Sequence, residues 1–116
     1  MKNFSIAIRE VGSIHVLDIS GELDAHTASQ LENSLKELIT MGKTQIIVNC
    51  NRLEYIASAG LGVFMAYIED VRSLGGDIKL SNMTERVYNV FDLLGFPTLY
   101  DILDDESEAI TDFQSK

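Results

Sequence analysis

The sequence is poor in the residues that build covalent or metal-based sites, because its 116 residues include one cysteine and two histidines. A single cysteine, Cys50, excludes a disulfide framework and a cysteine-based metal site. No apolar run approaches the ~18 residues that a membrane helix needs. The first residues, Met1-Lys2-Asn3-Phe4-Ser5, lack the apolar core of a signal peptide. We therefore expect a cytoplasmic protein with neither a metal nor another cofactor.

Basic residues are also scarce. Nine Lys and Arg stand against 18 Asp and Glu, which gives a net charge of −9. Binding to nucleic acid or to an anionic membrane needs clustered positive charge, so the net charge argues against both functions. An acidic protein instead favours association with a basic protein partner. The chain has the length of one domain, and we expect residues 1–116 to fold as a single unit.

Hydrophobic periodicity predicts alternating strands and helices. The expected strands cover about 4–9, 14–19, 45–50 and 77–80, while 99–103 is either a short strand or a packed loop. The expected helices run from Asp24 to about Met41, from Ser58 to about Leu74, from Asn82 to Gly95, and from Asp105 to about Gln114, with Asp24 and Asn82 as N-terminal caps. The apolar run 46–48 is typical of an interior strand that is covered on both faces. The prediction is an α/β fold, a mixed sheet of four to five strands packed with about four helices.

The most informative segment is 55–64, Tyr-Ile-Ala-Ser-Ala-Gly-Leu-Gly-Val-Phe. It places Ser58 where a strand passes into a helix, and a helix N-terminus favours an anion through its free amides and its dipole. Small residues flank the hydroxyl, so another protein's active site has room to approach it. We interpret Ser58 as a site of reversible phosphorylation. The simpler alternative is that its hydroxyl merely caps the helix.

An enzymatic function is disfavoured. Ser58, His26 and Asp24 are the residue types of a hydrolytic triad, and a serine between a strand and a helix resembles a nucleophile elbow. The elbow pattern, however, needs glycine at position 56, which is isoleucine here. Asp24 and His26 are also only two residues apart and point in different directions. We predict no catalytic residues.

Three segments together resemble the bacterial anti-sigma factor antagonists, the stand-alone form of the STAS domain. They are 21–28 (Gly-Glu-Leu-Asp-Ala-His-Thr-Ala), 56–63 (Ile-Ala-Ser-Ala-Gly-Leu-Gly-Val), and 75–80 (Gly-Gly-Asp-Ile-Lys-Leu) with the helix 87–95 behind it. The resemblance extends over nearly the whole chain at matching spacing. It implies a STAS-like fold and a role in partner switching that regulates transcription.

In that family the unphosphorylated antagonist binds a GHKL-type serine kinase that is an anti-sigma factor, and so releases the sigma factor. The resemblance implies that the kinase phosphorylates Ser58, that phosphorylation abolishes binding, and that a PP2C-type phosphatase resets the protein. The partner-binding residues it implies are Asp24, Ala57, Ser58, Ala59, Gly60 and Leu61. Family members often carry other residues where Ala57 and Ala59 stand, and these alanines leave Ser58 as the only candidate phosphate acceptor in the segment 56–63.

Two other functions stay open. The same fold without the switch would serve as a structural subunit of a transporter or a signalling assembly. Alternatively, the helix N-terminus at Ser58 would bind a small anion or a nucleotide. No lysine or arginine lies near Ser58 in the sequence, which argues for weak affinity in that case.

Overall fold

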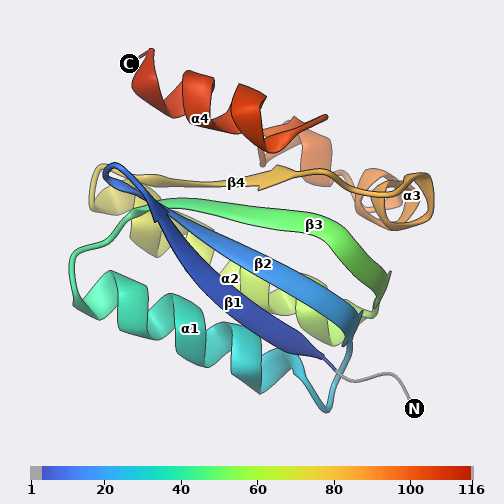
Figure 1. Cartoon of the computed structure of the whole chain (residues 1–116). Helices are drawn as coiled ribbons and strands as arrows, with labels where there is room; N and C mark the ends of the chain where they lie inside the picture. Colours follow the sequence, from blue (N-terminus) through green and yellow to red (C-terminus); the bar gives the residue numbers. More distant parts are fainter. Residues whose placement is uncertain (1–3, 116) are drawn as a thin grey trace.

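A computed structural model describes residues 4–115, and these residues build one five-stranded sheet (Figure 1). The elements are β1 (Ser5–Val11), β2 (Ile14–Leu23), α1 (Ala28–Thr40), β3 (Gln45–Ile56), α2 (Ser58–Ser73), β4 (Asp77–Ser81), α3 (Glu85–Leu93), the 3₁₀ turn η1 (Phe96–Thr98), β5 (Ile102–Leu103) and α4 (Glu106–Gln114). The strand order is β1-β2-β3-β4-β5. The β1–β2 hairpin is antiparallel and the other pairs are parallel. The predicted mixed α/β sheet is thus confirmed.

Helices cover both faces of the sheet. Figure 1 shows α1 and α2 on one side and α4 on the other. The alternation within the apolar run 46–48 matches this arrangement, because Ile46 and Val48 join the large core with α1 and α2, while Ile47 packs beneath α4. A continuous apolar run is the expected pattern for a strand buried on both sides.

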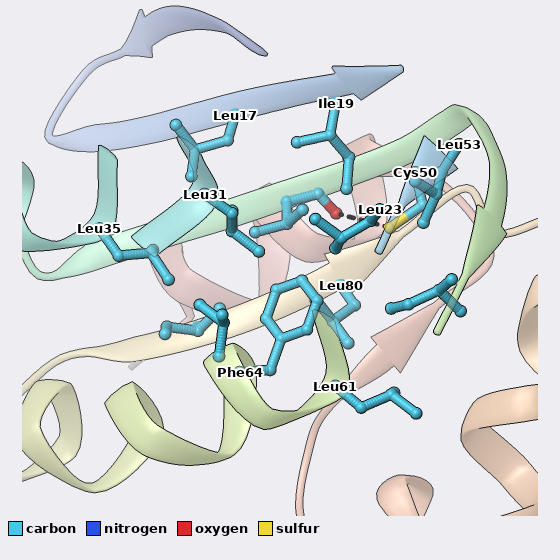
Figure 2. Close-up of a cluster of buried hydrophobic side chains, with 14 of the residues drawn as sticks. Leu17, Ile19, Leu23, Leu31, Leu35, Cys50, Leu53, Leu61, Phe64 and Leu80 are labelled. Atoms are coloured by element: carbon cyan, nitrogen blue, oxygen red, sulfur yellow. Dashed lines mark hydrogen bonds between the residues drawn. The ribbon is translucent and has the colours of Figure 1, made fainter. Parts of the chain in front are cut away.

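Figure 2 shows the large core between the sheet and its two covering helices. Leu31 and Leu35 of α1 and Phe64 of α2 are fully buried there. Cys50 of β3 is buried too, and burial raises the pKa of its thiol to about 12. The thiol therefore stays protonated and unreactive at neutral pH.

Aromatic rings of the same large core join α2, α3 and η1. Phe91 of α3 lies between Phe64 and Phe96, with ring centroids 6.0 and 5.1 Å away. Tyr100 stacks on Phe96, and its hydroxyl donates to the backbone carbonyl of Phe64. Such offset and edge contacts add to the burial of apolar area, so they fix α3 beside the end of β3.

The predicted cap Asp24 makes the capping contacts at the start of α1. Its carboxylate accepts from the amides of His26 and Thr27 at 2.9 and 3.2 Å, and the Thr27 hydroxyl accepts from the Asp24 amide at 2.9 Å. Thr27 directly precedes α1, but it has helical backbone angles and its side chain makes no capping hydrogen bond.

The predicted cap of α3 is wrong. Thr84, not Asn82, caps this helix by accepting from the amide of Val87. Both residues are polar and lie close to the helix start, so the sequence pattern fits either of them.

The C-terminal helix begins as expected at Asp105, which forms a capping box with Glu108. Its carboxylate pKa is lowered by hydrogen bonds from Ser107 and Glu108. The segment 99–103, which the sequence left open between strand and loop, contains the two-residue strand β5 beside β4.

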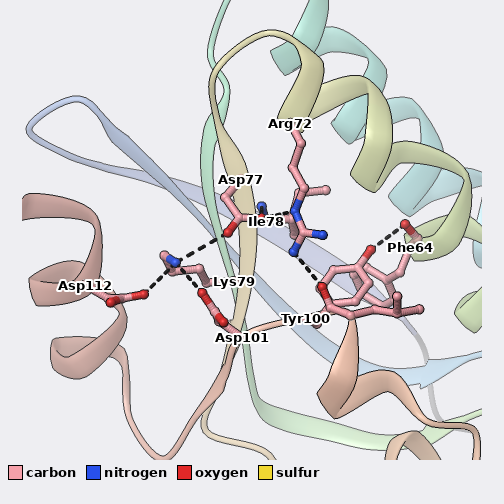
Figure 3. Close-up of polar contacts among 9 residues, drawn as sticks. Phe64, Arg72, Asp77, Ile78, Lys79, Tyr100, Asp101 and Asp112 are labelled. Carbon is pink, nitrogen blue, oxygen red and sulfur yellow. Dashed lines mark hydrogen bonds and ion pairs between the residues drawn. The ribbon is translucent and has the colours of Figure 1, made fainter. Parts of the chain in front are cut away.

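A buried lysine connects β4 to the C-terminal part of the chain. Lys79 is 0% exposed. Its Nζ lies 2.7 Å from Asp101, 2.6 Å from Asp112 and 3.4 Å from Asp77 (Figure 3). Burial acts to lower its pKa, but hydrogen bonds to the carboxylates outweigh that effect and the pKa is raised. Lys79 is therefore a cation at neutral pH.

None of the helices within residues 4–115 combines the length and the apolar character that crossing a membrane requires. Within the same range, histidine, cysteine and acidic side chains nowhere form a group of three placed to hold a metal ion.

Candidate functional site

Ser58 is the first residue of α2 and is exposed to solvent. Ala57 precedes it in an extended conformation and is the N-cap residue; its carbonyl accepts from the amides of Gly60 at 3.0 Å and Leu61 at 3.2 Å. The alternative interpretation of Ser58 as the capping residue is therefore wrong. The Ser58 side chain is exposed, so its hydroxyl is available to another molecule.

Two backbone amides accompany this hydroxyl. In a helix that begins at Ser58, the amides of Ser58 and Ala59 have no intrahelical acceptor. The helix dipole adds a partial positive charge at the same end. A dianionic group on the hydroxyl would therefore be stabilised by the backbone itself, without a neighbouring cation.

The end of β2 lies beside the start of α2. Leu23 pairs with Ile56 in the parallel β2–β3 ladder, and the Ala57 amide donates to the Leu23 carbonyl at 2.9 Å. Asp24 follows immediately, so the chain brings Asp24 and Ser58 to one edge of the sheet from 34 positions apart in the sequence. The carboxylate of Asp24 is held in its turn by amides 2.9 and 3.2 Å away, those of His26 and Thr27.

Gly60 and Leu61 are buried and contribute to packing. A Cβ atom on Gly60 would lie 2.6 Å from Leu23 Cγ, so only glycine permits this close approach of α2 to β2. Leu61 is buried in the large core. Of the six predicted partner-binding residues, these two thus present no side chain to a partner, whereas Ser58 is exposed and Asp24, Ala57 and Ala59 are partly exposed.

A groove next to this edge includes residues that the sequence reasoning missed. It has a volume of about 330 Å³ between the end of β3 and α3. Tyr55, which is 51% exposed, lines it together with Arg86 and Val90. Tyr55 belongs to the informative segment 55–64, so the sequence placed it near Ser58. No such signal in the sequence marked the α3 residues, which reach the groove only through tertiary packing.

The chain is similar to anti-sigma factor antagonists along most of its length. Residues 5–109 match the STAS domain. The anti-sigma-B factor antagonist of Bacillus subtilis is 30% identical over 100 residues, which cover 86% of this chain and 91% of that protein.

Solved structures of anti-sigma factor antagonists also share the fold of this chain. The Bacillus anti-sigma factor antagonist SpoIIAA in its unphosphorylated form superposes with a TM-score of 0.74 at 25% identity, covering 96% of this chain and 98% of that one. Its phosphorylated form gives 0.74 at 26% identity, with coverage of 94% and 99%. An antagonist from Mycobacterium paratuberculosis shares the fold, with a TM-score of 0.82 at 20% identity and coverage of 94% and 92%. From its sequence match and its fold, the chain belongs to the STAS domain family, and it resembles that family's anti-sigma factor antagonists.

Proposed function

We propose that this chain is a partner-switching regulator whose switch is Ser58. Its unphosphorylated form binds a GHKL-type serine kinase that acts as an anti-sigma factor, and so releases the sigma factor. The kinase phosphorylates Ser58 and the complex dissociates. A PP2C-type phosphatase then removes the phosphate and restores binding.

The observation that carries this proposal is the exposed Ser58 hydroxyl at the first residue of α2, beside amides that lack an intrahelical acceptor. The fold can accept a phosphate there without rearrangement. The similarity to SpoIIAA, which has been solved with and without phosphorylation, supports a switch by phosphorylation in this chain.

The binding surface in this proposal is the edge formed by Asp24, Ala57, Ser58 and Ala59, extended by the groove that Tyr55 lines. A phosphate adds about −1.5 to −2 charges at neutral pH. A partner that buries Ser58 would have to bury this charge, which costs on the order of 3–5 kcal/mol without a compensating cation. That cost weakens binding by a factor of roughly 10² to 10³·⁵.

Ser58→Asp should therefore reduce affinity for the host's anti-sigma kinase at least about a hundredfold. Ser58→Ala should bind constitutively and resist phosphorylation. Calorimetric titration of each purified variant with the kinase measures both effects. Thr111→Asp is the matched control, because it makes the same kind of change at an exposed position of α4, on the other side of the sheet.

Phosphopeptide mapping of the protein from its host tests the modification directly. Ser58 phosphorylation that varies with growth and stress is the expected result. Tight kinase binding by fully phosphorylated protein would contradict the proposal. Ser58 unmodified in every condition, together with co-purification of a transporter ATPase, would instead favour the structural subunit.

A further inference from the structure

A polar pocket lies on the other face of the sheet from α1 and α2. Helix α4 covers only part of that face, where Ala109 and Phe113 pack on Ile14, Val16 and Ile47. Towards the ends of β2 and β3, an open pocket of about 410 Å³ takes the place of a covering element. Parallel strands are normally buried on both faces, so a polar opening over the β2–β3 pair is unusual.

A bulge in β3 shapes this pocket. Asp18 of β2 is opposite Asn49, but Ser20 is opposite Arg52, so β3 carries one extra residue between these two pairs. As a result Asn51 and Arg52 are both exposed and both line the pocket. Bulges of this kind redirect side chains and are frequent beside functional sites.

The two arginines of the pocket differ in how they are paired. Both carboxylate oxygens of Asp18 accept from Arg9, at 2.5 and 2.9 Å, and Arg9 also pairs with Glu106 at 2.6 Å. Arg52, in contrast, forms no ion pair or side-chain hydrogen bond recorded within residues 4–115. An unpaired guanidinium in a pocket presents parallel N–H donors to an anion. The attraction is local, because the chain's net charge of −9 repels anions at longer range.

Hydroxyl groups complete the lining. Ser5 and Ser20 face each other across the β1–β2 ladder with their oxygens 2.7 Å apart, and both line the pocket. Each can rotate to donate to a ligand or to accept from it. The pocket thus presents the guanidinium group of Arg52 and, separately, the neutral hydroxyl groups of Ser5 and Ser20.

We propose that this pocket binds a small organic anion. Arg52, supported by Asn51, would hold its carboxylate or phosphate group through paired hydrogen bonds, a geometry that the guanidinium fork fits. Ser5 and Ser20 would bind the polar remainder of the ligand. Because α2 packs on the opposite face, the site is separate from Ser58 and does not depend on the proposed switch.

The test is an NMR titration of the isotope-labelled full chain with inorganic phosphate and, separately, with succinate. Saturable shifts at the amides of Ser20, Asn51 and Arg52 are expected, and the probe that binds more tightly identifies the head group. Arg52→Gln should weaken this binding about tenfold, the effect of losing a charged hydrogen bond. Since Arg52 is exposed, the variant should keep the native spectrum.

Arg86→Gln is the matched control and should leave the affinity unchanged, because Arg86 lines the groove at α3 instead. Three results would overturn the proposal. They are shifts confined to the first turn of α2, non-saturating shifts spread over the surface, and equal affinity of the Arg52→Gln variant for the tighter probe.

Discussion

Two glycines in the first turns of α2 occupy opposite environments, although they are only two residues apart. The helix lies so close to β2 that a methyl group on Gly60 would overlap Leu23, at 2.6 Å from Cγ and 2.8 Å from Cδ2. Gly62 is exposed, and a methyl group there would meet nothing within 4 Å. The close approach at Gly60 holds the Ser58 edge against the end of β2, so it matters for the site as well as for the core.

Gly60→Ala should lower the free energy of unfolding by about 1–3 kcal/mol, because the overlap forces Leu23 or the helix to move. Gly62→Ala should raise it by up to about 1 kcal/mol, since alanine favours a helix and nothing obstructs it. Denaturation in urea measures both. If the two variants shifted stability in the same direction, the close contact would not be the reason for Gly60.

At the scale of elements, α4 is fastened to the sheet by an ion pair at its first turn. Glu106 accepts from Arg9 Nη2 at 2.6 Å and from Asn49 Nδ2 at 3.0 Å. Its hydrogen bond with Arg9 lowers the pKa of the Glu106 carboxyl below its ordinary value of 4.5. Folding therefore stabilises the charged form.

The pKa of the Glu106 carboxyl is lower in the folded protein than in the unfolded chain. The ion pair therefore stabilises the fold fully at pH values above the unfolded-state pKa, and this stabilisation is lost as the pH falls through the folded-state pKa. Glu106→Gln should cost about 1 kcal/mol at neutral pH. In more acid solution wild-type Glu106 is protonated, so the two stabilities should converge. Urea denaturation across pH tests this, with Glu37→Gln on the exposed side of α1 as control. A cost that stayed constant with pH would contradict the ion-pair explanation.

For the whole molecule, the network around Lys79 joins segments distant in sequence. Asp77, which contacts Lys79 from β4, also accepts from Arg72 of α2 at 2.9 Å, and Arg72 donates to the Leu99 carbonyl at 2.6 Å. The lysine stem lies under α4, with Nζ 4.8 Å from the centroid of the Phe113 ring. Figure 3 shows Arg72 and Lys79 both in contact with Asp77 of β4.

Lys79→Met should lower the free energy of unfolding by about 3 kcal/mol, because it leaves several carboxylates close together without their cation. The exposed Lys36 of α1 provides the control, and Lys36→Met should change stability by less than about 0.5 kcal/mol. Thermal and urea denaturation of both variants makes the comparison. Equal stability of the two variants would show that the buried cation is dispensable.

The sequence by itself determined the alternation of strands and helices, the covering of β3 on both faces, and the place of Ser58 between strand and helix. These features follow from local periodicity and from glycine and capping patterns, which act over a few neighbouring residues. It did not determine which residue caps α3, since Asn82 fits the pattern as well as Thr84.

Only the tertiary structure decided which side chains share a site. Lys79 lies in a short strand, where a charged side chain would ordinarily face solvent. It is instead fully buried, because Asp101 and Asp112 converge on it from the C-terminal segment. Strand register likewise decides two other features. It places Asp24 beside the Ser58 edge, and it produces the bulge that directs Arg52 into the pocket. Register is set by long-range pairing and core packing, and neither is encoded in any local stretch of the chain.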